Sequence, residues 1–182
     1  RVDAKAVRID LTRTRWQPTG TYAVPGEVVT VTVPPELVGK GYRVRINAHT
    51  DDVSRRDEWK RPPIVHRSFE IDAETIEVAS AFGGAIFLDL GGEDGFSAPP
   101  SSSSSGGGSA SVPDAVIVTV SNAVEHPYFV LGEHSDDDWT GGRLALRNKP
   151  APCAVFVSPS LIFVQPASDT FDLTEPTDLM TW

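Results

Sequence analysis

The sequence has one cysteine, no long apolar run and no excess of positive charge. The single Cys153 excludes an internal disulfide and a zinc site built from four thiolates. No apolar run approaches the roughly 20 residues that a membrane-spanning helix needs. Lys and Arg number 16 against 25 Asp and Glu, which gives a formal net charge of −9. Nucleic acid and anionic membrane surfaces are therefore poor candidates for partners.

Familiar catalytic motifs are also missing. None of the four histidines stands in an H-E-x-x-H zinc motif, and no G-x-S-x-G serine motif or glycine-rich phosphate loop occurs. Cys153 lies between Pro152 and Ala154 beside an apolar run, which is typical of a core thiol rather than a nucleophile. We therefore assign no catalytic residue from the sequence.

What is present indicates an all-β fold. The chain has 182 residues, 40% hydrophobic content, 15 Gly and 15 Pro, which favours one sizeable core with many turns. In residues 27–33, valines alternate with threonines, as in a strand with one buried face. Similar short patterns recur at 4–11, 42–48, 69–71, 75–78, 86–90, 115–121, 155–157 and 161–164. We predict a two-sheet antiparallel β-sandwich, similar to a jelly roll.

Glycines and prolines mark special points along the chain. Residues 16–26 contain Thr19-Gly20 and Pro25-Gly26, and we interpret this stretch as turns that lead into the valine strand. The pair Gly83-Gly84 precedes an apolar run, which predicts a bulge or a close backbone approach at the start of a fully buried strand.

The domain prediction is one β-sandwich over residues 1–172. Residues 91–111 include SSSSSGGGSAS, which cannot bury apolar area and is interpreted as a low-complexity loop insertion between two strands. Residues 173–182 contain Thr174, early acids and Pro176, which are signals for a helix start. We expect this end to be the beginning of a helical segment that continues in a longer protein.

Several short stretches resemble the N-terminal portion of the enhancin-like zinc metallopeptidase domain, which occurs in mucin-degrading peptidases. They occur in the family's order: W-Q-P-T-G-T-Y-A-V-P-G-E at 16–27, H-T-D at 49–51, the tryptophan and R-P at 59–62, G-G at 83–84, N-A-V-E-H-P-Y at 122–128 and A-P-C-A at 151–154. The resemblance covers nearly the whole chain. Related domains occur in vertebrate TRP-channel-associated factors.

The resemblance implies a function for a longer protein. Such peptidases use an H-E-x-x-H helix whose histidines bind zinc, so zinc is expected in a catalytic part outside this chain and no cofactor is expected within it. This chain would then be a non-catalytic part that buttresses the catalytic domain of the same protein. Glycoproteins such as mucins, or their glycans, would be the substrates, and the protein would be secreted or at the cell surface. The alternative is a free-standing carbohydrate- or protein-binding module without an enzyme.

Five residues are candidates for a site. Trp59, Arg61 and Trp139 lie in charged loops where an exposed aromatic face beside polar groups could bind a glycan, although a tryptophan there is more often a buried plug. His49 and Asp51 could bind a metal at a strand end, although a turn capped by Asp51 or Asp52 with a half-exposed His49 is the more common explanation of such a pattern. The acidic run at 133–138 lacks the glycine and glutamate of a calcium loop, so a solvated loop is expected.

Overall fold

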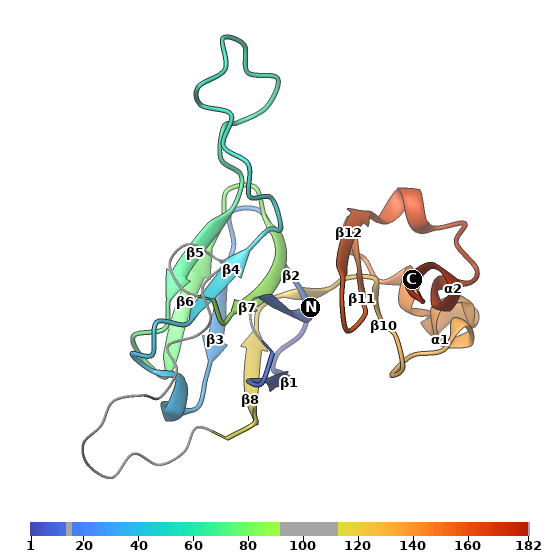
Figure 1. The fold of residues 1–182 in the computed structure, drawn as a ribbon, viewed down its shortest axis with the longest axis horizontal. Helices are drawn as coiled ribbons and strands as arrows, with labels where there is room; N and C mark the ends of the chain where they lie inside the picture. Colours follow the sequence, from blue (N-terminus) through green and yellow to red (C-terminus); the bar gives the residue numbers. More distant parts are fainter. Residues whose placement is uncertain (14–15, 92–112, 182) are drawn as a thin grey trace.

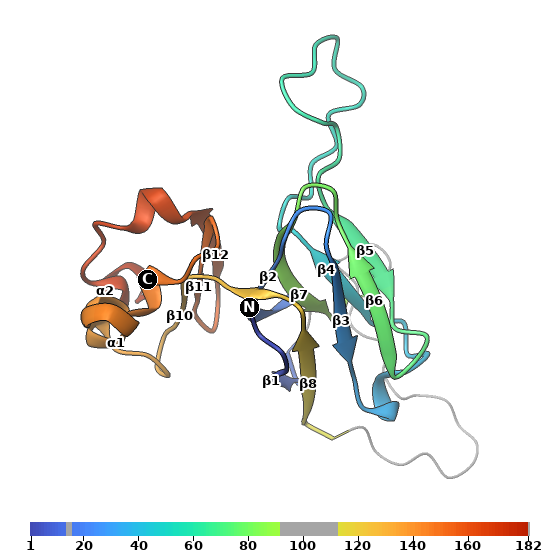
Figure 2. The ribbon, with the colours of Figure 1, turned by 180° about the vertical axis from the view of Figure 1, so that it is seen from behind.

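The structure, a computed structural model, describes residues 1–13, 16–91 and 113–181. All but the first residue of the predicted Ser/Gly-rich loop at 91–111 lies outside the described residues. In Figures 1 and 2 the chain forms a two-sheet body, which carries the N-terminus, and a C-terminal unit beside it. None of the helices in the described ranges has the length and apolar character needed to cross a membrane.

The two-sheet body is a jelly roll. One sheet has the order β1 (Lys5–Asp10), β8 (Ala115–Ser121), β3 (Val28–Thr32) and β6 (Thr75–Ala79). The other has the order β5 (Arg67–Glu70), β4 (Arg43–Ile46), β7 (Gly84–Asp89), β2 (Trp16–Ala23) and β9 (Val124–Glu125). The chain crosses repeatedly between the sheets, and every pairing within them is antiparallel. The predicted all-β, jelly-roll-like sandwich is confirmed.

The C-terminal unit holds a third sheet, which contains the predicted strands at 155–157 and 161–164 although these were expected in the two-sheet sandwich. It has the order β10 (Tyr128–Val130), β11 (Cys153–Val157) and β12 (Ile162–Pro166), with β10 and β11 parallel. Two short helices accompany it, α1 (Asp136–Thr140) and α2 (Pro176–Met180). The C-terminal unit also has the 3-10 helices η2 (Gly142–Leu144), η3 (Leu146–Asn148) and η4 (Ala167–Thr170), whereas η1 (Pro35–Leu37) belongs to the jelly roll.

Alternating side chains connect these layers through three hydrophobic clusters. In β7, Ile86 and Leu88 face the four-stranded sheet, whereas Ala85 and Phe87 face the C-terminal unit. In β11, Val155 and Val157 meet Ala85 and Phe87, whereas Ala154 and Phe156 pack toward α1 and α2. Because neighbouring residues in a strand point to opposite faces, both strands are buried on both sides. The five-stranded sheet is therefore the middle of three sheet layers.

The valine strand and the glycine pair behave as predicted. Val29 and Val31 are almost fully buried in the jelly-roll core. A Cβ added to Gly84 would lie 2.7 Å from the Cβ of Asn47, so the two backbones approach too closely for any side chain at this position. Gly83 has a φ of +65° just before this contact.

The prediction for residues 16–26 is wrong in its first half. Residues Trp16–Ala23 form β2 rather than a turn, and their pairing with β7 shifts register between Pro18 and Tyr22. Gly20, with a φ of +68°, lies in this irregular section. A bulged strand uses the same glycine and proline signals as a turn, which explains the misreading. The expected turn is present at Pro25-Gly26, before β3.

A long projection joins β4 to β5. Figure 1 shows this segment extending beyond both sheets, and we call residues 49–64 the finger. Its two sides are joined by a hydrogen bond from the Val53 N–H to the Pro63 carbonyl at 3.2 Å. The Arg61 guanidinium also forms an ion pair with Asp51 across the finger. The finger therefore has internal bracing although it lies away from the core.

The predicted helix start at 173–182 corresponds to α2. Met180 is buried in the cluster around Trp139, and the Thr177 N–H donates to the Asp136 carboxylate at 2.9 Å. These contacts dock α2 on the C-terminal unit. The predicted boundary at residue 172 lies between η4 and α2, and as a division between folding units it stays a prediction.

Candidate functional site

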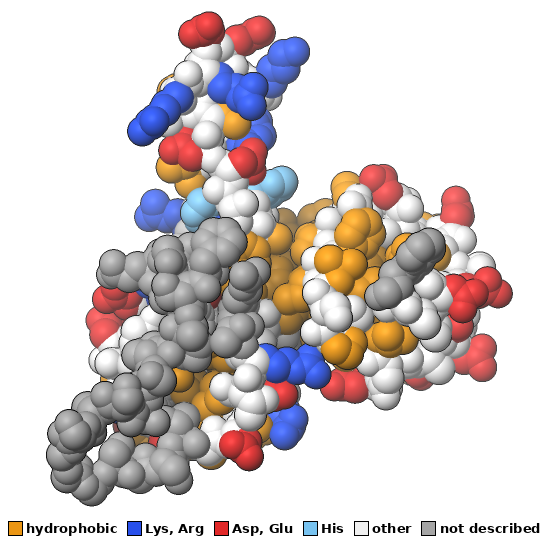
Figure 3. Space-filling model, viewed as in Figure 1, with side chains coloured by type: hydrophobic (Ala, Val, Ile, Leu, Met, Phe, Trp, Pro, Cys, Tyr) orange, Lys and Arg blue, Asp and Glu red, His pale blue; other side chains and the backbone are white. Residues whose placement is uncertain are grey.

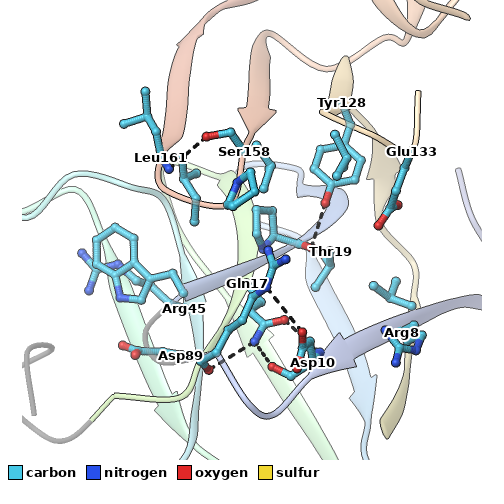
Figure 4. Close-up of a pocket in the computed structure, with 18 of the residues that line it drawn as sticks. Arg8, Asp10, Gln17, Thr19, Arg45, Asp89, Tyr128, Glu133, Ser158 and Leu161 are labelled. Carbon is cyan, nitrogen blue, oxygen red and sulfur yellow. Dashed lines mark hydrogen bonds and ion pairs between the residues drawn. The ribbon is translucent and has the colours of Figure 1, made fainter. Parts of the chain in front are cut away.

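A cleft of about 1480 Å³ lies between the jelly roll and the C-terminal unit (Figures 3 and 4). One side is formed by β1, the first half of β2 and the base of the finger. The other side is formed by β10, the loop after it and the turn between β11 and β12. Because both halves of the molecule contribute, the cleft exists only when the C-terminal unit is docked on the five-stranded sheet.

At the floor of the cleft, the Gln17 side chain bridges the two sheets of the jelly roll. Its amide oxygen accepts from the Asp10 N–H at 2.9 Å, and its amide nitrogen donates to the Asp10 carbonyl. Figure 4 shows Gln17 reaching toward Asp10. The Thr12 hydroxyl donates to the Asp10 carboxylate at 2.6 Å, and this bond is the main reason that the pKa of Asp10 is lowered. The carboxylate therefore stays ionised beside the cleft.

Beneath the base of the finger, a buried arginine is stacked on an indole. The guanidinium of Arg45 lies 4.1 Å from the ring centre of Trp16 and donates to the backbone carbonyls of Asn47 and His49. Burial lowers the pKa of Arg45, while Asp89 nearby opposes that shift. Since its hydrogen bonds go to the protein backbone, Arg45 positions the base of the finger.

The opposite side of the cleft is aromatic and hydroxyl-rich. The Tyr128 ring packs edge-on against both His126 and His134, and burial raises its pKa. At the turn between β11 and β12, the Ser158 hydroxyl accepts from the Leu161 N–H at 3.2 Å, and the Leu161 side chain is 52% exposed. Figure 4 shows Tyr128 reaching toward β2, where its hydroxyl donates to the Pro18 carbonyl at 3.5 Å.

The cleft differs in charge from the rest of the molecule. Its basic side chains are Lys5, Arg8, Arg13, Arg43 and Arg45, and its acidic ones are Asp10, Asp89 and Glu133. The whole chain carries a net charge of −9, and acids gather on the outer edge of the C-terminal unit (Figure 3). The field in the cleft is therefore more favourable to an anionic ligand than the net charge of the chain suggests.

The described residues of the cleft do not include an activated serine or cysteine nucleophile. Within the described part of the chain, no cleft serine or cysteine hydrogen-bonds to a histidine, which is the pairing that activates a nucleophile. Cys153 packs against the cluster of Ala85 and Val155 and does not line the cleft, and burial raises the pKa of its thiol to about 11. The thiol therefore stays protonated at neutral pH and is a poor nucleophile.

The structure gives the predicted glycan contacts Trp59 and Arg61 different environments. Trp59 is 56% exposed on the finger, as an aromatic platform would be. Arg61, on the same finger, is half-buried, and besides its ion pair with Asp51 it donates to the carbonyls of Pro62 and Pro63. Arg61 thus braces the finger and has little remaining capacity for a ligand.

Trp139 does not offer a face to any ligand. It is fully buried in the C-terminal unit, with its ring centre 4.9 Å from that of Phe156. The prediction of an exposed platform there is corrected by this burial. The acidic residues before Trp139 are the first turn of α1, where Ser135 forms a capping box with Asp138. The charge run that suggested an exposed loop is a helix N-terminus that turns Trp139 inward.

His49 and Asp51 are brought together, but without a third metal ligand. The His49 Nδ1 lies 3.7 Å from an Asp51 carboxylate oxygen, and both side chains are more than half exposed. The Asp51 carboxylate is already paired with Arg61, a cation that competes with any metal. No group of three His, Cys, Asp or Glu side chains suited to a metal occurs among the described residues.

Gln17, Arg8 and Tyr128 belong to the cleft, yet sequence reasoning did not identify them. Arg8 lies in a predicted strand and Gln17 in a stretch interpreted as turns, and the cleft forms only when distant segments meet. One signal was available: a polar Gln17 between Trp16 and the buried Pro18 is unusual for a chain entering a core.

The chain is similar to known proteins over most of its length. The family model described as the N-terminal domain of M60-like peptidases matches residues 3–100. A TRPM8 channel-associated factor homolog from Danio rerio is 34% identical over 164 residues. That alignment covers 90% of this chain but 16% of the relative. The chain thus spans about a sixth of the length of this relative.

Solved peptidases share the fold. The IMPa metallopeptidase from Pseudomonas aeruginosa matches with a TM-score of 0.64 and 17% identity, covering 92% of this chain and 18% of the peptidase chain. The ZmpB metallopeptidase from Clostridium perfringens matches with a TM-score of 0.59 and 14% identity, covering 97% of this chain and 38% of its own. Another IMPa structure, with a TM-score of 0.60, 16% identity and coverage of 91% and 18%, is in complex with an O-glycopeptide.

The family model spans more than half of the chain, including β1 to β7 and the finger. The matched solved structures cover nearly all of it, including the C-terminal unit. The chain belongs to the family of N-terminal domains of M60-like peptidases.

Proposed function

We propose that this chain is the non-catalytic N-terminal domain of an enhancin-like metallopeptidase that acts on glycoproteins such as mucins. The observation that carries the proposal is the family match at residues 3–100 in a chain that has no H-E-x-x-H motif. In this proposal the domain buttresses a catalytic domain of the same protein. The protein would be secreted or at the cell surface, where such substrates occur.

The residues of this chain do not fit a catalytic zinc. His49 and Asp51 form a pair rather than a set of three ligands, and Arg61 occupies the Asp51 carboxylate. A catalytic zinc site needs three protein ligands and an open position. We therefore assign no step of peptide hydrolysis to this chain and expect zinc in the catalytic part.

Support for a glycoprotein substrate comes from an IMPa structure in complex with an O-glycopeptide. On this chain, the exposed Trp59 is the residue that we propose as a glycan contact. Replacing Trp59 with Ala should weaken binding of an O-glycopeptide several-fold, because an aromatic contact contributes about 0.5–1.5 kcal/mol. Isothermal titration would measure this, with Ile64→Ala, also exposed on the finger, as the matched control.

The main experiment compares the full-length protein with a version that lacks residues 1–182. We expect the deletion to reduce mucin cleavage and to lower the melting temperature of the catalytic part, while bound zinc per molecule is retained. Unchanged cleavage and stability would show that the domain does not buttress the enzyme. Loss of zinc would instead place metal ligands in this chain and contradict the proposal.

A second function is favoured by the curated relatives. Identity to the TRPM8 channel-associated factor homolog is 34%, twice the 17% shared with IMPa. If the chain functions as in this relative, it is a protein-binding module of a protein that is not a peptidase. The reading frame after Trp182 discriminates between the two functions: an H-E-x-x-H with a later glutamate supports the peptidase, and its absence supports the binding module.

A further inference from the structure

The free edge of β1 lies along the cleft and carries unpaired backbone groups. Strand β1 pairs with β8 on one side only, and Lys5, Ala6, Val7, Arg8 and Asp10 all line the cleft. Of the residues that the structure describes, none pairs with β1 as a strand on the other side. An exposed sheet edge of this kind is a template for a further strand.

The direction of the unpaired groups follows from two hydrogen bonds. The Leu11 N–H donates to Asp114, which continues the ladder with β8, whereas both backbone groups of Asp10 are bonded to Gln17 on the opposite side. In an antiparallel ladder, alternate residues direct both backbone groups toward the same neighbour. Ala6 and Arg8 therefore direct their N–H and C=O groups into the cleft, as Asp10 does.

The Gln17 side-chain amide takes the place of a neighbouring strand at one residue of β1, Asp10. A strand paired with β1 would accept from the Asp10 N–H and donate to the Asp10 carbonyl, and the Gln17 amide does both. The sheet edge at Asp10 is thereby closed. The edge at Arg8 and Ala6 has no such substitute in the described part of the chain.

Charge at the open edge selects for acidic side chains. Arg8 is exposed and has no hydrogen bond or ion pair among the described residues. Lys5, at the other end of the edge, forms an ion pair with Glu125. Across the cleft stands Glu133 (Figure 4). A bound segment with an acid opposite Arg8 would pair with it, whereas a cation at that position would be repelled by the Arg8 guanidinium.

We propose that the cleft binds an extended, acidic peptide segment, which pairs with the edge of β1 at Ala6 and Arg8 as an additional β-strand. Main-chain hydrogen bonds supply the binding energy common to all such segments, and Arg8 supplies the selectivity for acids. The cleft thus serves as a peptide-docking surface, independent of the peptidase or module to which the chain belongs.

Residue-resolved amide hydrogen exchange tests the proposal on the intact chain. In the free chain, the amides of Ala6 and Arg8 should exchange rapidly, while those of Val7 and Ile9 are protected by β8. Addition of the synthetic peptide EVEVEVE should protect Ala6 and Arg8 selectively. If these two amides are as protected as Val7 without peptide, the edge is already covered and the proposal fails. Rapid exchange that saturating EVEVEVE leaves unchanged also overturns it.

Variants separate strand pairing from simple charge attraction. Ala6→Pro removes an outward N–H without removing a bond to β8, because proline is tolerated on a sheet edge; it should abolish protection at Arg8. Arg8→Glu should reduce affinity for EVEVEVE about tenfold and favour KVKVKVK instead. The control Arg55→Glu, on the finger, should leave both affinities unchanged. Equal losses in Arg55→Glu and Arg8→Glu would show non-specific charge attraction and refute the proposed site.

Discussion

The indole N–H of Trp139 donates a hydrogen bond to the backbone carbonyl of Leu173, at 2.9 Å. This bond connects α1 with the segment that leads into α2, although the two residues are 34 positions apart in sequence. The same indole packs on Phe156 of β11. One side chain therefore joins the third sheet and both helices of the C-terminal unit.

Loss of this side chain should destabilise the chain strongly. Trp139→Ala should lower the free energy of unfolding by about 3–5 kcal/mol, because it leaves a large cavity in the core. Trp139→Phe keeps most of the packing but leaves the Leu173 carbonyl unpaired, at a cost of about 1–3 kcal/mol. Urea unfolding would measure both, with Trp59→Ala as an exposed control expected within about 0.5 kcal/mol of the parent. A similar loss in all three variants would contradict the packing of the C-terminal unit.

The glycine pair provides a second test. Gly84→Ala should cost more than about 2 kcal/mol, because its Cβ would clash with the Asn47 backbone, 2.8 Å from the nitrogen. Gly39 also has a positive φ, but a Cβ at this position would meet open space. Gly39→Ala should therefore cost about 1 kcal/mol of backbone strain. Thermal unfolding would compare them. Equal costs would mean that backbone conformation, rather than close approach, requires Gly84.

His126 should make stability depend on pH. Burial lowers its pKa from 6.5 to about 4 in the folded chain, although its ring nitrogen bonds the Pro127 carbonyl. In the unfolded chain the histidine binds a proton below about 6.5, whereas the folded chain excludes that proton until about 4. Stability should therefore fall by about 3 kcal/mol as pH decreases through this window, and above it His126 has no effect.

His126→Phe isolates this contribution, because it removes the titrating group and keeps a ring beside Tyr128. Urea unfolding between pH 4 and 7 should show a shallower loss of stability in the variant than in the parent, by about 1.4 kcal/mol per pH unit at most. His49→Gln, an exposed position, is the control. Parallel profiles for the parent and His126→Phe would show that His126 becomes protonated without unfolding.

The isolated chain should not cleave proteins. It carries no H-E-x-x-H motif, and in the described ranges no three suitable side chains gather around a metal position. Incubation with mucin and casein in the presence of added zinc should leave both intact, as judged by electrophoresis. Cleavage that persists after repurification and disappears with a chelator would place peptidase activity in this chain.

Local patterns in the sequence predicted most of the jelly roll, because most strands of that core show their own burial; the bulged strand β2 is the exception. The valines at 29 and 31, and the glycine pair before β7, specify their surroundings within a few residues. The C-terminal unit was less predictable. Its sheet includes a parallel pair, β10 with β11, whose residues are separated by α1 and two 3-10 helices.

The candidate site was harder to predict than the fold. Arg45 alternates with the inward residues Val44 and Ile46 of β4, a pattern typical of a solvent-facing position, yet it is buried against Trp16. Trp139 follows three aspartates, yet it points inward, because α1 places it against Phe156 of β11 and the Leu173 carbonyl. In both cases burial depends on a distant segment, which single-strand patterns do not record.

The double-sided burial of β7 has a consequence for protein engineering. A fragment that ended after β9 would retain every strand of the jelly roll, but Ala85 and Phe87 would lose Val155 and Val157, which cover them. Such a fragment would expose a flat apolar sheet face and would be prone to self-association. The jelly roll and the C-terminal unit should therefore be kept together in fusions, domain swaps and expression trials.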